Sequence, residues 1–443
     1  MFAYPAGKYP PFRQWSNLIV LPDSEFSTAS SLSQLLNYDS LLIFALVLML
    51  TSGAAREMLR PRLSSTTRVL IVVAVLFTAG GLVALPASNH MGLSFGRVLA
   101  HLTVILFAIL LSRVELRATE VRILMAAAIA GTGLVMAGGL YAFYSSYGIP
   151  SSLFSVMFAH FDFTTSFYDY ERFTYGNPAQ TQEVIVLTMP LCFSMSLATG
   201  TRIFERTIYI VVGFLLLVNC VIAFERWALV VLSASLLLIM ARLLYQGRKQ
   251  ALLIIGALIG ALVVFVALPS IADGRVVLYF TRATQAGQAD NLSDRISNWT
   301  HGIDAIRQNP WGVGFGTEIE QAGLPYGVAH NILIDTWIGG GPLAMAGAVV
   351  WLVWHLRGLL RHFWSAASRS PTLKSEATFG LYLGAFDLAF YAIFQAVPFY
   401  AYGIGVWMAL WLVFPVLARA LTDEGSNSNG PDSTARVHLP TTA

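Results

Sequence analysis

The chain of 443 residues is 56% hydrophobic and only 12% charged, about half the charged fraction of an ordinary soluble domain. Its mean hydropathy of +0.65 indicates many membrane spans and little soluble mass. A net charge of +3, spread along the chain, argues against nucleic-acid binding, and two cysteines inside apolar runs argue against disulfide or metal chemistry.

The N-terminal segment, residues 1–37, carries prolines and charged residues but no apolar core. It therefore predicts neither a cleavable signal peptide nor a membrane span. Pro22, Asp23 and Glu25 argue most directly against a span in this segment.

Eleven apolar runs follow, each near the roughly 20 residues that a helix needs to cross a hydrocarbon core about 30 Å thick. They predict an all-α polytopic membrane protein with about eleven transmembrane helices, eight in residues 38–269 and three in residues 330–420. In the ninth run Gly339-Gly340-Gly341-Pro342 predicts a kink or a short break, because proline removes a helix hydrogen bond. The runs lie near residues 38–55, 69–86, 94–112, 122–146, 183–199, 207–223, 227–245, 251–269, 331–355, 377–397 and 400–418.

Positive residues mark the connections that stay in the cytoplasm. Basic connections alternate along the chain with the other connections. Among these others, the short ones near 87–93 and 398–400 carry no lysine or arginine. The basic ones contain Arg56, Arg60, Arg62 and Arg68; Arg113, Arg117 and Arg122; Arg202 and Arg206; Arg242, Arg248 and Lys249; and Arg357, Arg361, Arg369 and Lys374. This pattern predicts that the N-terminus and residues 147–182 and 270–329 lie outside, whereas the C-terminus lies inside.

The predicted outer loop 147–182 ends in Arg172-Phe173-Thr174-Tyr175-Gly176-Asn177-Pro178, at the start of a span. A lone arginine in an outer loop is common, so the interest of Arg172 comes from the Gly-Asn-Pro that follows it. Aromatic residues earlier in this loop can stack on sugar rings, but anchoring at the membrane interface is the simpler explanation for them.

A minimal outer turn, Phe224-Glu225-Arg226-Trp227, separates the sixth and seventh predicted spans. Arg226 is the only positive residue in this turn. It either pairs with Glu225 and marks the membrane interface, or presents its charge to an anionic ligand.

The loop 270–329 is long for a connection in a membrane protein, and long ordered loops are usually functional. An amphipathic helix is expected in it, because one helical stripe is apolar: Ile296, Trp299, Ile303 and Ile306. Ser293 is the candidate N-cap and Asn309-Pro310 the expected end of this helix, which should lie on the membrane face or the protein surface. Arg295 shares a face with Trp299, where it either snorkels to lipid phosphates or binds an anionic ligand.

A glycine run, Gly312, Gly314 and Gly316, follows this helix. These glycines permit positive φ and a close approach of backbone to a ligand, although a plain loop is the alternative. The spacing is not a nucleotide-binding fingerprint, because no lysine follows and no strand precedes it.

His330 and Asn331 stand at the start of the ninth predicted span. A neutral histidine titrates near pH 6.5, and a helix N-terminus disfavours the imidazolium while favouring anions. His330 is therefore the best candidate for a general base, with packing at the interface as the alternative. Asp335 lies about 140° around a helix from His330, so it is not expected to orient the ring.

Asp387 is an ionisable residue deep in the tenth predicted span. A charge at that depth marks a functional site by default, but it can also join two helices. Gly384 and Ala385 favour a close helix contact there. After the last span, residues 421–443 are rich in small and polar residues and predict a disordered cytoplasmic tail.

The loop 270–329 and the helix start after it resemble the signature of the bacterial O-antigen ligase and polymerase superfamily. The features that carry the resemblance are Arg295, Trp299 one helical turn on, Asn309-Pro310, the glycine run and His330-Asn331. The resemblance covers roughly a tenth of the chain, residues 294–335. It implies an inner-membrane enzyme with its catalytic loops on the periplasmic face and an undecaprenyl-pyrophosphate-linked glycan as donor. The acceptor would be a saccharide or a lipid A core, and neither a cofactor nor a metal is expected.

The resemblance also implies roles for individual residues. Arg226, Arg295 and Arg172 would bind the donor pyrophosphate, and His330 would take the proton from the acceptor hydroxyl, which predicts inversion at the anomeric carbon. The supporting residues would be Trp299, Gly312, Gly314, Gly316, Asn331, Asn177 and Asp387. Two positions depart from the family pattern: Glu225 replaces a serine, and Ala179 stands where a second asparagine is often seen.

The sequence does not distinguish a ligase from a polymerase, because acceptor recognition is spread over variable outer loops. A transporter or flippase of lipid-linked oligosaccharide is the alternative from another class, and it would place several charges along a path through the spans. Asp387 is the one charged residue predicted deep in the membrane. This favours an enzyme that acts at the outer surface over a transporter. A structural partner without catalysis would leave the long outer loop unexplained.

Overall fold

The computed structural model describes residues 64–113, 118–147, 178–222, 226–248, 256, 292–316, 329–365, 370–394 and 412–421. Within these ranges every regular element is a helix, and the one β-type pairing is an isolated bridge between Thr199 and Thr372. The predicted all-α class is confirmed for this part of the chain. The predicted spans near 38–55 and 251–269 lie outside the described residues, apart from Gly256.

The helices correspond closely to eight of the predicted spans. Five are long and apolar enough to cross a membrane, counted over the described residues: Ser65–Ala87, Ser94–Leu111, Thr119–Gly138, Ile332–Phe363 and Leu373–Phe394. The total of about eleven spans stays a prediction. The elements are α5 (Ser65–Ala84), η2 (Leu85–Ala87), α6 (Met91–Leu111), α7 (Ala118–Tyr147), α10 (Pro178–Ser196), α11 (Ile203–Ile222), α12 (Arg226–Tyr245), α15 (Leu292–Gln308), α17 (Ile332–Phe363), α19 (Leu373–Phe394) and a short helix, Leu412–Leu421.

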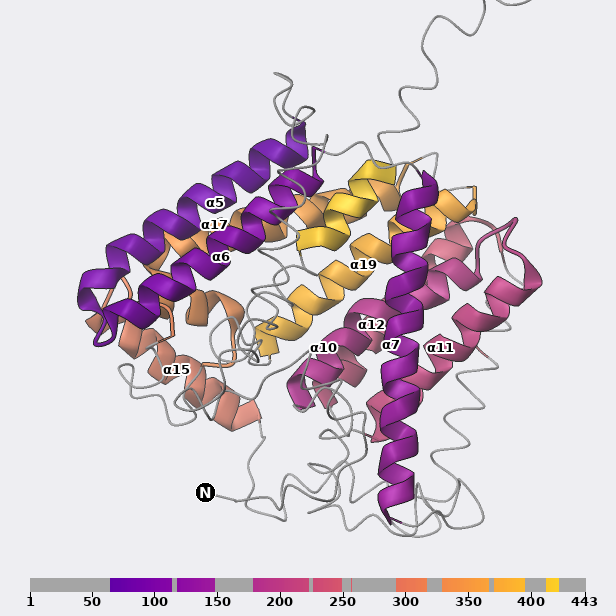
Figure 1. The fold of residues 1–443 in the computed structure, drawn as a ribbon, viewed down its shortest axis with the longest axis horizontal. Helices are drawn as coiled ribbons and strands as arrows, with labels where there is room; N and C mark the ends of the chain where they lie inside the picture. The colour runs from indigo at the N-terminus through magenta and orange to yellow at the C-terminus, as the bar shows by residue number, and fades with distance from the viewer. Residues whose placement is uncertain are drawn as a thin grey trace, which may run out of the picture.

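Two groups of helices meet at α17 and α19. Helix α17 packs along α5, which also contacts α6, while α19 packs along α10 and α12 (Figure 1). Glycines allow the closest approaches: a Cβ added at Gly384 of α19 would overlap the Leu187 carbonyl oxygen of α10, and one at Gly347 of α17 would lie 2.8 Å from the Phe77 ring. The close helix contact predicted at Gly384 is confirmed.

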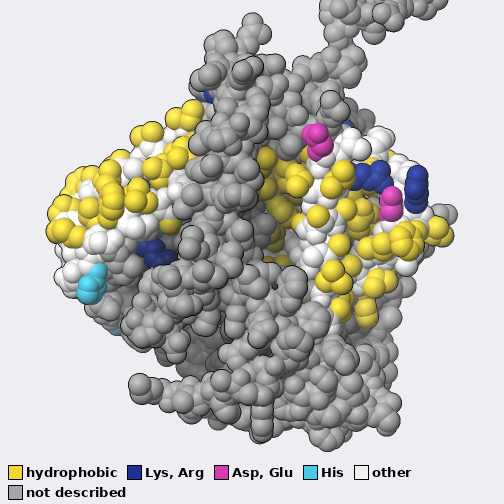
Figure 2. Space-filling model, in the orientation of Figure 1, with side chains coloured by type: hydrophobic (Ala, Val, Ile, Leu, Met, Phe, Trp, Pro, Cys, Tyr) yellow, Lys and Arg dark blue, Asp and Glu magenta, His cyan; other side chains and the backbone are white. Residues whose placement is uncertain are grey.

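Apolar side chains cover the outward faces of several helices, as expected for helices that face lipid. Val75 of α5 and Val211 of α11, for example, are 60% and 58% exposed. Figure 2 shows such side chains gathered over both flanks of the molecule. A soluble protein rarely leaves so much contiguous apolar surface in water.

Helix α17 is broken where the sequence predicts it. Gly341 has φ 68° and ψ −170°, and Pro342 follows. Because proline has no N–H, the carbonyl oxygen of Ile338 loses its helical partner. The Val313 amide donates to that oxygen at 2.8 Å, and the Gly314 amide donates to the Gly339 carbonyl oxygen at 3.0 Å.

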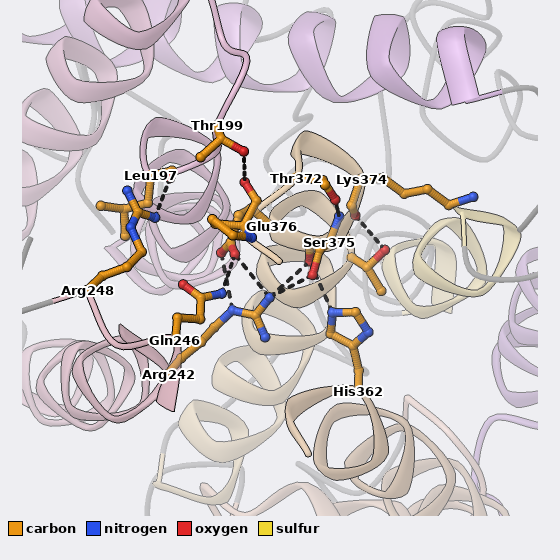
Figure 3. A network of polar contacts seen from close by, with 12 residues as sticks. Leu197, Thr199, Arg242, Gln246, Arg248, His362, Thr372, Lys374, Ser375 and Glu376 are labelled. Atoms are coloured by element: carbon orange, nitrogen blue, oxygen red, sulfur yellow. Dashed lines mark hydrogen bonds and ion pairs between the residues drawn. The ribbon is translucent and has the colours of Figure 1, made fainter. Parts of the chain in front are cut away.

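Several connections predicted to lie on one side of the membrane do meet at one end of the helices. The Thr199 amide donates to the Pro371 carbonyl oxygen at 2.6 Å, and Arg248 donates to the Leu197 carbonyl oxygen at 2.6 Å. We call this the basic end; it comprises residues 197–202, 242–248, 361–365 and 370–376 (Figure 3). The opposite ends of α12, α17 and α19 therefore lie together, which agrees with the alternation predicted from the arginines.

Candidate active site

Helix α15 confirms the predicted amphipathic helix, including its end before Asn309, although it begins at Leu292, one residue before the predicted N-cap. Its buried face differs from the apolar stripe. Arg295 is only 4% exposed, whereas Ile296 is 51% and Ile303 44% exposed. The side that α15 turns toward the protein is thus polar at Arg295 and Asn298 and small at Gly302.

Gly302 brings α15 against the start of α17. A Cβ added there would lie 2.6 Å from the Ile334 side chain and 3.0 Å from Ala329. Ala305 and Ala329 belong to a small apolar cluster that continues into Ile338. This contact carries Arg295 toward His330, close enough that the arginine charge acts on the histidine ring.

His330 has a left-handed backbone, with φ 56°, directly before α17. The Asp335 carboxylate accepts hydrogen bonds from the Ala329 amide at 2.7 Å and the Asn331 amide at 3.0 Å, on both sides of His330. The Asn331 side chain caps α17 by accepting from the Leu333 amide at 3.0 Å. Asp335 therefore holds the backbone that carries His330, and the turn stays fixed although φ is unusual for a residue with a Cβ.

The electrostatic setting keeps the His330 ring neutral. Partial burial, and then the Arg295 charge, lower the pKa of His330 from 6.5 to about 3. The ring is a proton acceptor at any pH above that value, and the guanidinium beside it favours a negatively charged ligand.

Contacts between aromatic rings connect α15 to the start of α12. Trp227 stacks on Phe394 with ring centroids 4.4 Å apart, and Phe394 lies 6.0 Å from Trp299 of α15. Helix α12 begins at Arg226, so the Arg226 backbone lies at the same end as α15 and His330. We call this the site end; it comprises residues 226–227, 292–316, 329–331 and 394.

The glycine run adopts the positive φ that its glycines permit, with φ 88° at Gly312, 95° at Gly314 and 87° at Gly316. The backbone it approaches is that of the broken helix: a Cβ added at Gly312 would lie 2.7 Å from the Gly341 nitrogen. Phe315 is buried and packs 4.6 Å from the His101 ring. The contacts that the structure gives Gly312 and Gly314 are thus structural, since they close the gap in α17.

Asp387 is buried in α19 and accepts a hydrogen bond from the Ser235 hydroxyl of α12. This contact joins two helices, which is the alternative that the small residues beside Asp387 favoured. Arg172 and Asn177, the remaining predicted site residues, lie outside the described residues.

Sequence reasoning missed two polar residues of α10. Gln182 and Glu183 are both fully buried, and over the described part of the chain their side chains have no hydrogen-bond partner. The predicted span near 183–199 begins at Glu183, which puts this residue at the edge of the span. A glutamine and a glutamate within the first two turns after Pro178 were the available signal, and Asp387 is consequently not the only buried carboxylate inside these helices.

Within the described ranges, no three His, Cys, Asp or Glu side chains gather closely enough to hold a metal ion. The family model for O-antigen ligase matches residues 211–349. The matched segment contains Arg226, Arg295, the glycine run and His330, but neither Arg172 nor Asp387. No curated protein matches the chain.

Proposed function

We propose a function from the premise that this chain belongs to the O-antigen ligase and polymerase superfamily, whose domain covers residues 211–349. Members are membrane enzymes that join glycans, so the chain is a membrane glycan ligase or polymerase. The finer proposal is an inner-membrane glycosyltransferase that acts on the periplasmic face. It transfers or polymerises glycan from an undecaprenyl-pyrophosphate-linked donor onto a sugar acceptor.

The observation that carries this proposal is the close contact of α15 with the start of α17 at Gly302, which brings the buried Arg295 beside His330. A buried guanidinium can grip a phosphate with two parallel hydrogen bonds, and partial exclusion of water strengthens them. We assign the donor pyrophosphate to Arg295, with Arg226 and Arg172 as further cations around it. The backbone position of Arg226 at the site end supports its part, and the role of Arg172 rests on the sequence alone.

His330 would act as the general base. The acceptor hydroxyl attacks the anomeric carbon and forms the new C–O bond, while the bond to the pyrophosphate breaks and the pyrophosphate leaves with the electron pair. The hydroxyl proton passes to the neutral His330 ring. Because the Arg295 charge helps to lower the pKa of His330, a bound pyrophosphate would offset that charge and raise the pKa, so the base would strengthen when donor is present.

The direct attack requires inversion, since no side chain serves as a covalent nucleophile. We further propose that the site end faces the periplasm and the basic end the cytoplasm, because arginine-rich connections stay inside. The exposed Ile296 and Ile303 would then rest α15 on the outer leaflet, beside a donor that arrives within the membrane.

The purified full chain and a synthetic undecaprenyl-pyrophosphate glycan of defined anomeric configuration test the function. We expect release of undecaprenyl pyrophosphate only with an acceptor present, and a product of inverted configuration. A lipid-linked acceptor that grows by repeat units identifies a polymerase, whereas transfer only to a lipid A core identifies a ligase. Movement of intact donor across a vesicle membrane without bond cleavage would instead establish the transporter.

A further inference from the structure

One face of the second half of α17 remains open to the surroundings. A shallow groove of about 540 Å³ runs along it, and its lining residues are Val353, Leu356, Arg357, Leu360, Arg361 and Trp364. Val353 is 58% and Trp364 66% exposed. The opposite face of the same helix is buried through Trp351, His355, Leu359 and His362.

The groove changes from apolar to cationic as it approaches the basic end. The His362 ring donates to the Ser375 carbonyl oxygen at 3.0 Å, which places its neighbour Arg361 level with the start of α19. Arg357 lies about one helical turn, or about 5.4 Å, deeper, and Val353 a further turn. The surface therefore has the order of a membrane leaflet: apolar first, then positive charge, with an aromatic ring at the boundary.

The two arginines of the groove differ from others at the same end. Arg242 forms an ion pair with Glu376 at 3.1 Å, and Arg248 donates to the Leu197 carbonyl oxygen at 2.6 Å. Over the described residues, Arg357 and Arg361 have no hydrogen bond or ion pair to the protein. They lie at i and i+4 on one helix face, so both guanidinium groups can reach a single anion.

We propose that this groove binds one anionic glycerophospholipid of the surrounding leaflet. Arg357 and Arg361 hold its phosphate, and an acyl chain lies along Val353, Leu356 and Leu360. A free phosphate ion would leave the apolar half of the groove without a purpose. The lipid-linked donor is served at the opposite end of α17, where Arg295 and His330 lie.

Native mass spectrometry of the purified full chain tests the site, with dioleoylphosphatidylglycerol and dioleoylphosphatidylcholine as probes of equal acyl length. We expect the chain to retain more phosphatidylglycerol than phosphatidylcholine. The double variant Arg357→Gln/Arg361→Gln should lower that retention by about tenfold or more and leave phosphatidylcholine unchanged, since charge-assisted contacts are lost. Arg202→Gln is the matched control, because this exposed arginine lies at the basic end but outside the groove.

Wild-type retention in the double variant, or an equal loss in Arg202→Gln, would overturn the site. Displacement of phosphatidylglycerol by an equal concentration of undecaprenyl phosphate or inorganic phosphate would overturn the occupant.

Trp364 gives a second measurement that needs no arginine variant. Phosphatidylglycerol brominated in its acyl chain should quench the share of fluorescence that Trp364→Phe removes, and brominated phosphatidylcholine should quench it less. Equal quenching by both lipids would contradict a specific anionic site.

Discussion

Two buried arginines lie at opposite ends of the helices, and their neighbours differ. Arg242, 1% exposed, pairs with Glu376 at 3.1 Å and donates to the Ser375 hydroxyl at 3.0 Å (Figure 3). Its guanidinium also lies 4.3 Å from the Phe379 ring centroid. Arg295, 4% exposed, lies instead beside His330 and lowers its pKa. Burial of an arginine therefore does not by itself indicate a binding site. The carboxylate partner of Arg242 indicates a structural role, whereas Arg295 lies beside a neutral histidine at the place that we propose for the donor pyrophosphate.

The largest effect should come from the base at the site end. His330→Gln keeps a hydrogen-bonding group but removes the titrating nitrogen, so product formation from a defined donor should fall about 10²- to 10⁴-fold. Donor binding should remain. The matched control is His301→Gln, since His301 is an exposed histidine of α15. A fully active His330→Gln variant rules out the proposed base.

At the basic end the expected effect is on stability. Arg242→Ala leaves the Glu376 carboxylate buried without its ion-pair partner, which should cost about 3–5 kcal/mol of folding free energy. Thermal unfolding in detergent measures this cost. The double variant Arg242→Ala/Glu376→Ala should recover part of it, because no single buried charge is then left; an unchanged melting temperature in Arg242→Ala would show that the pair contributes little.

Arg295→Lys should show the opposite behaviour, with near-normal stability and weaker donor binding. A lysine keeps the charge but lacks the planar fork, so the loss of donor affinity should be on the order of 2–3 kcal/mol. Arg307→Lys on the same helix is the control, because Arg307 is exposed and pairs with Asp304 at 2.9 Å. Equal donor affinity in Arg295→Lys and wild type argues that Arg295 does not hold the pyrophosphate.

Asp335→Asn should produce a smaller change through the backbone of His330. An amide accepts one of the two hydrogen bonds at 2.7 and 3.0 Å but cannot accept both as a carboxylate does. We expect a loss of about 1–3 kcal/mol in transition-state stabilisation, with donor affinity nearly unchanged. Wild-type turnover in this variant would mean that the turn at His330 does not need the carboxylate.

Much of the fold could be predicted from the sequence because its signals are local. An apolar run near 20 residues specifies a span, Asn309-Pro310 ends α15, and Gly341-Pro342 breaks α17. The buried face of α15 could not be predicted. In a membrane protein an apolar stripe can face lipid, so the exposed Ile296 and Ile303 and the buried Arg295 reverse the rule for soluble helices.

The residues of the candidate site could be proposed from the sequence, but their contacts could not. The 140° angle that separated Asp335 from His330 assumes that both residues lie on one helix. His330 instead precedes the helix in a left-handed turn. The Asp335 carboxylate holds the backbone of this turn, a role that the angle between the two side chains does not reveal. The hydrogen-bond partners of the glycine run could not be predicted either. The Val313 and Gly314 amides donate to carbonyl oxygens of α17 that are available only because the helix is broken there.

The most direct test is a titration of His330 in the purified chain by nuclear magnetic resonance, with and without undecaprenyl pyrophosphate. In the free chain the ring should stay neutral down to a pKa of about 3, since burial and the Arg295 charge both oppose protonation. Bound pyrophosphate should raise the pKa of His330, because its negative charge offsets the guanidinium. A pKa near 6.5 in the free chain, or one that pyrophosphate leaves unchanged, would contradict a shared site of Arg295 and His330.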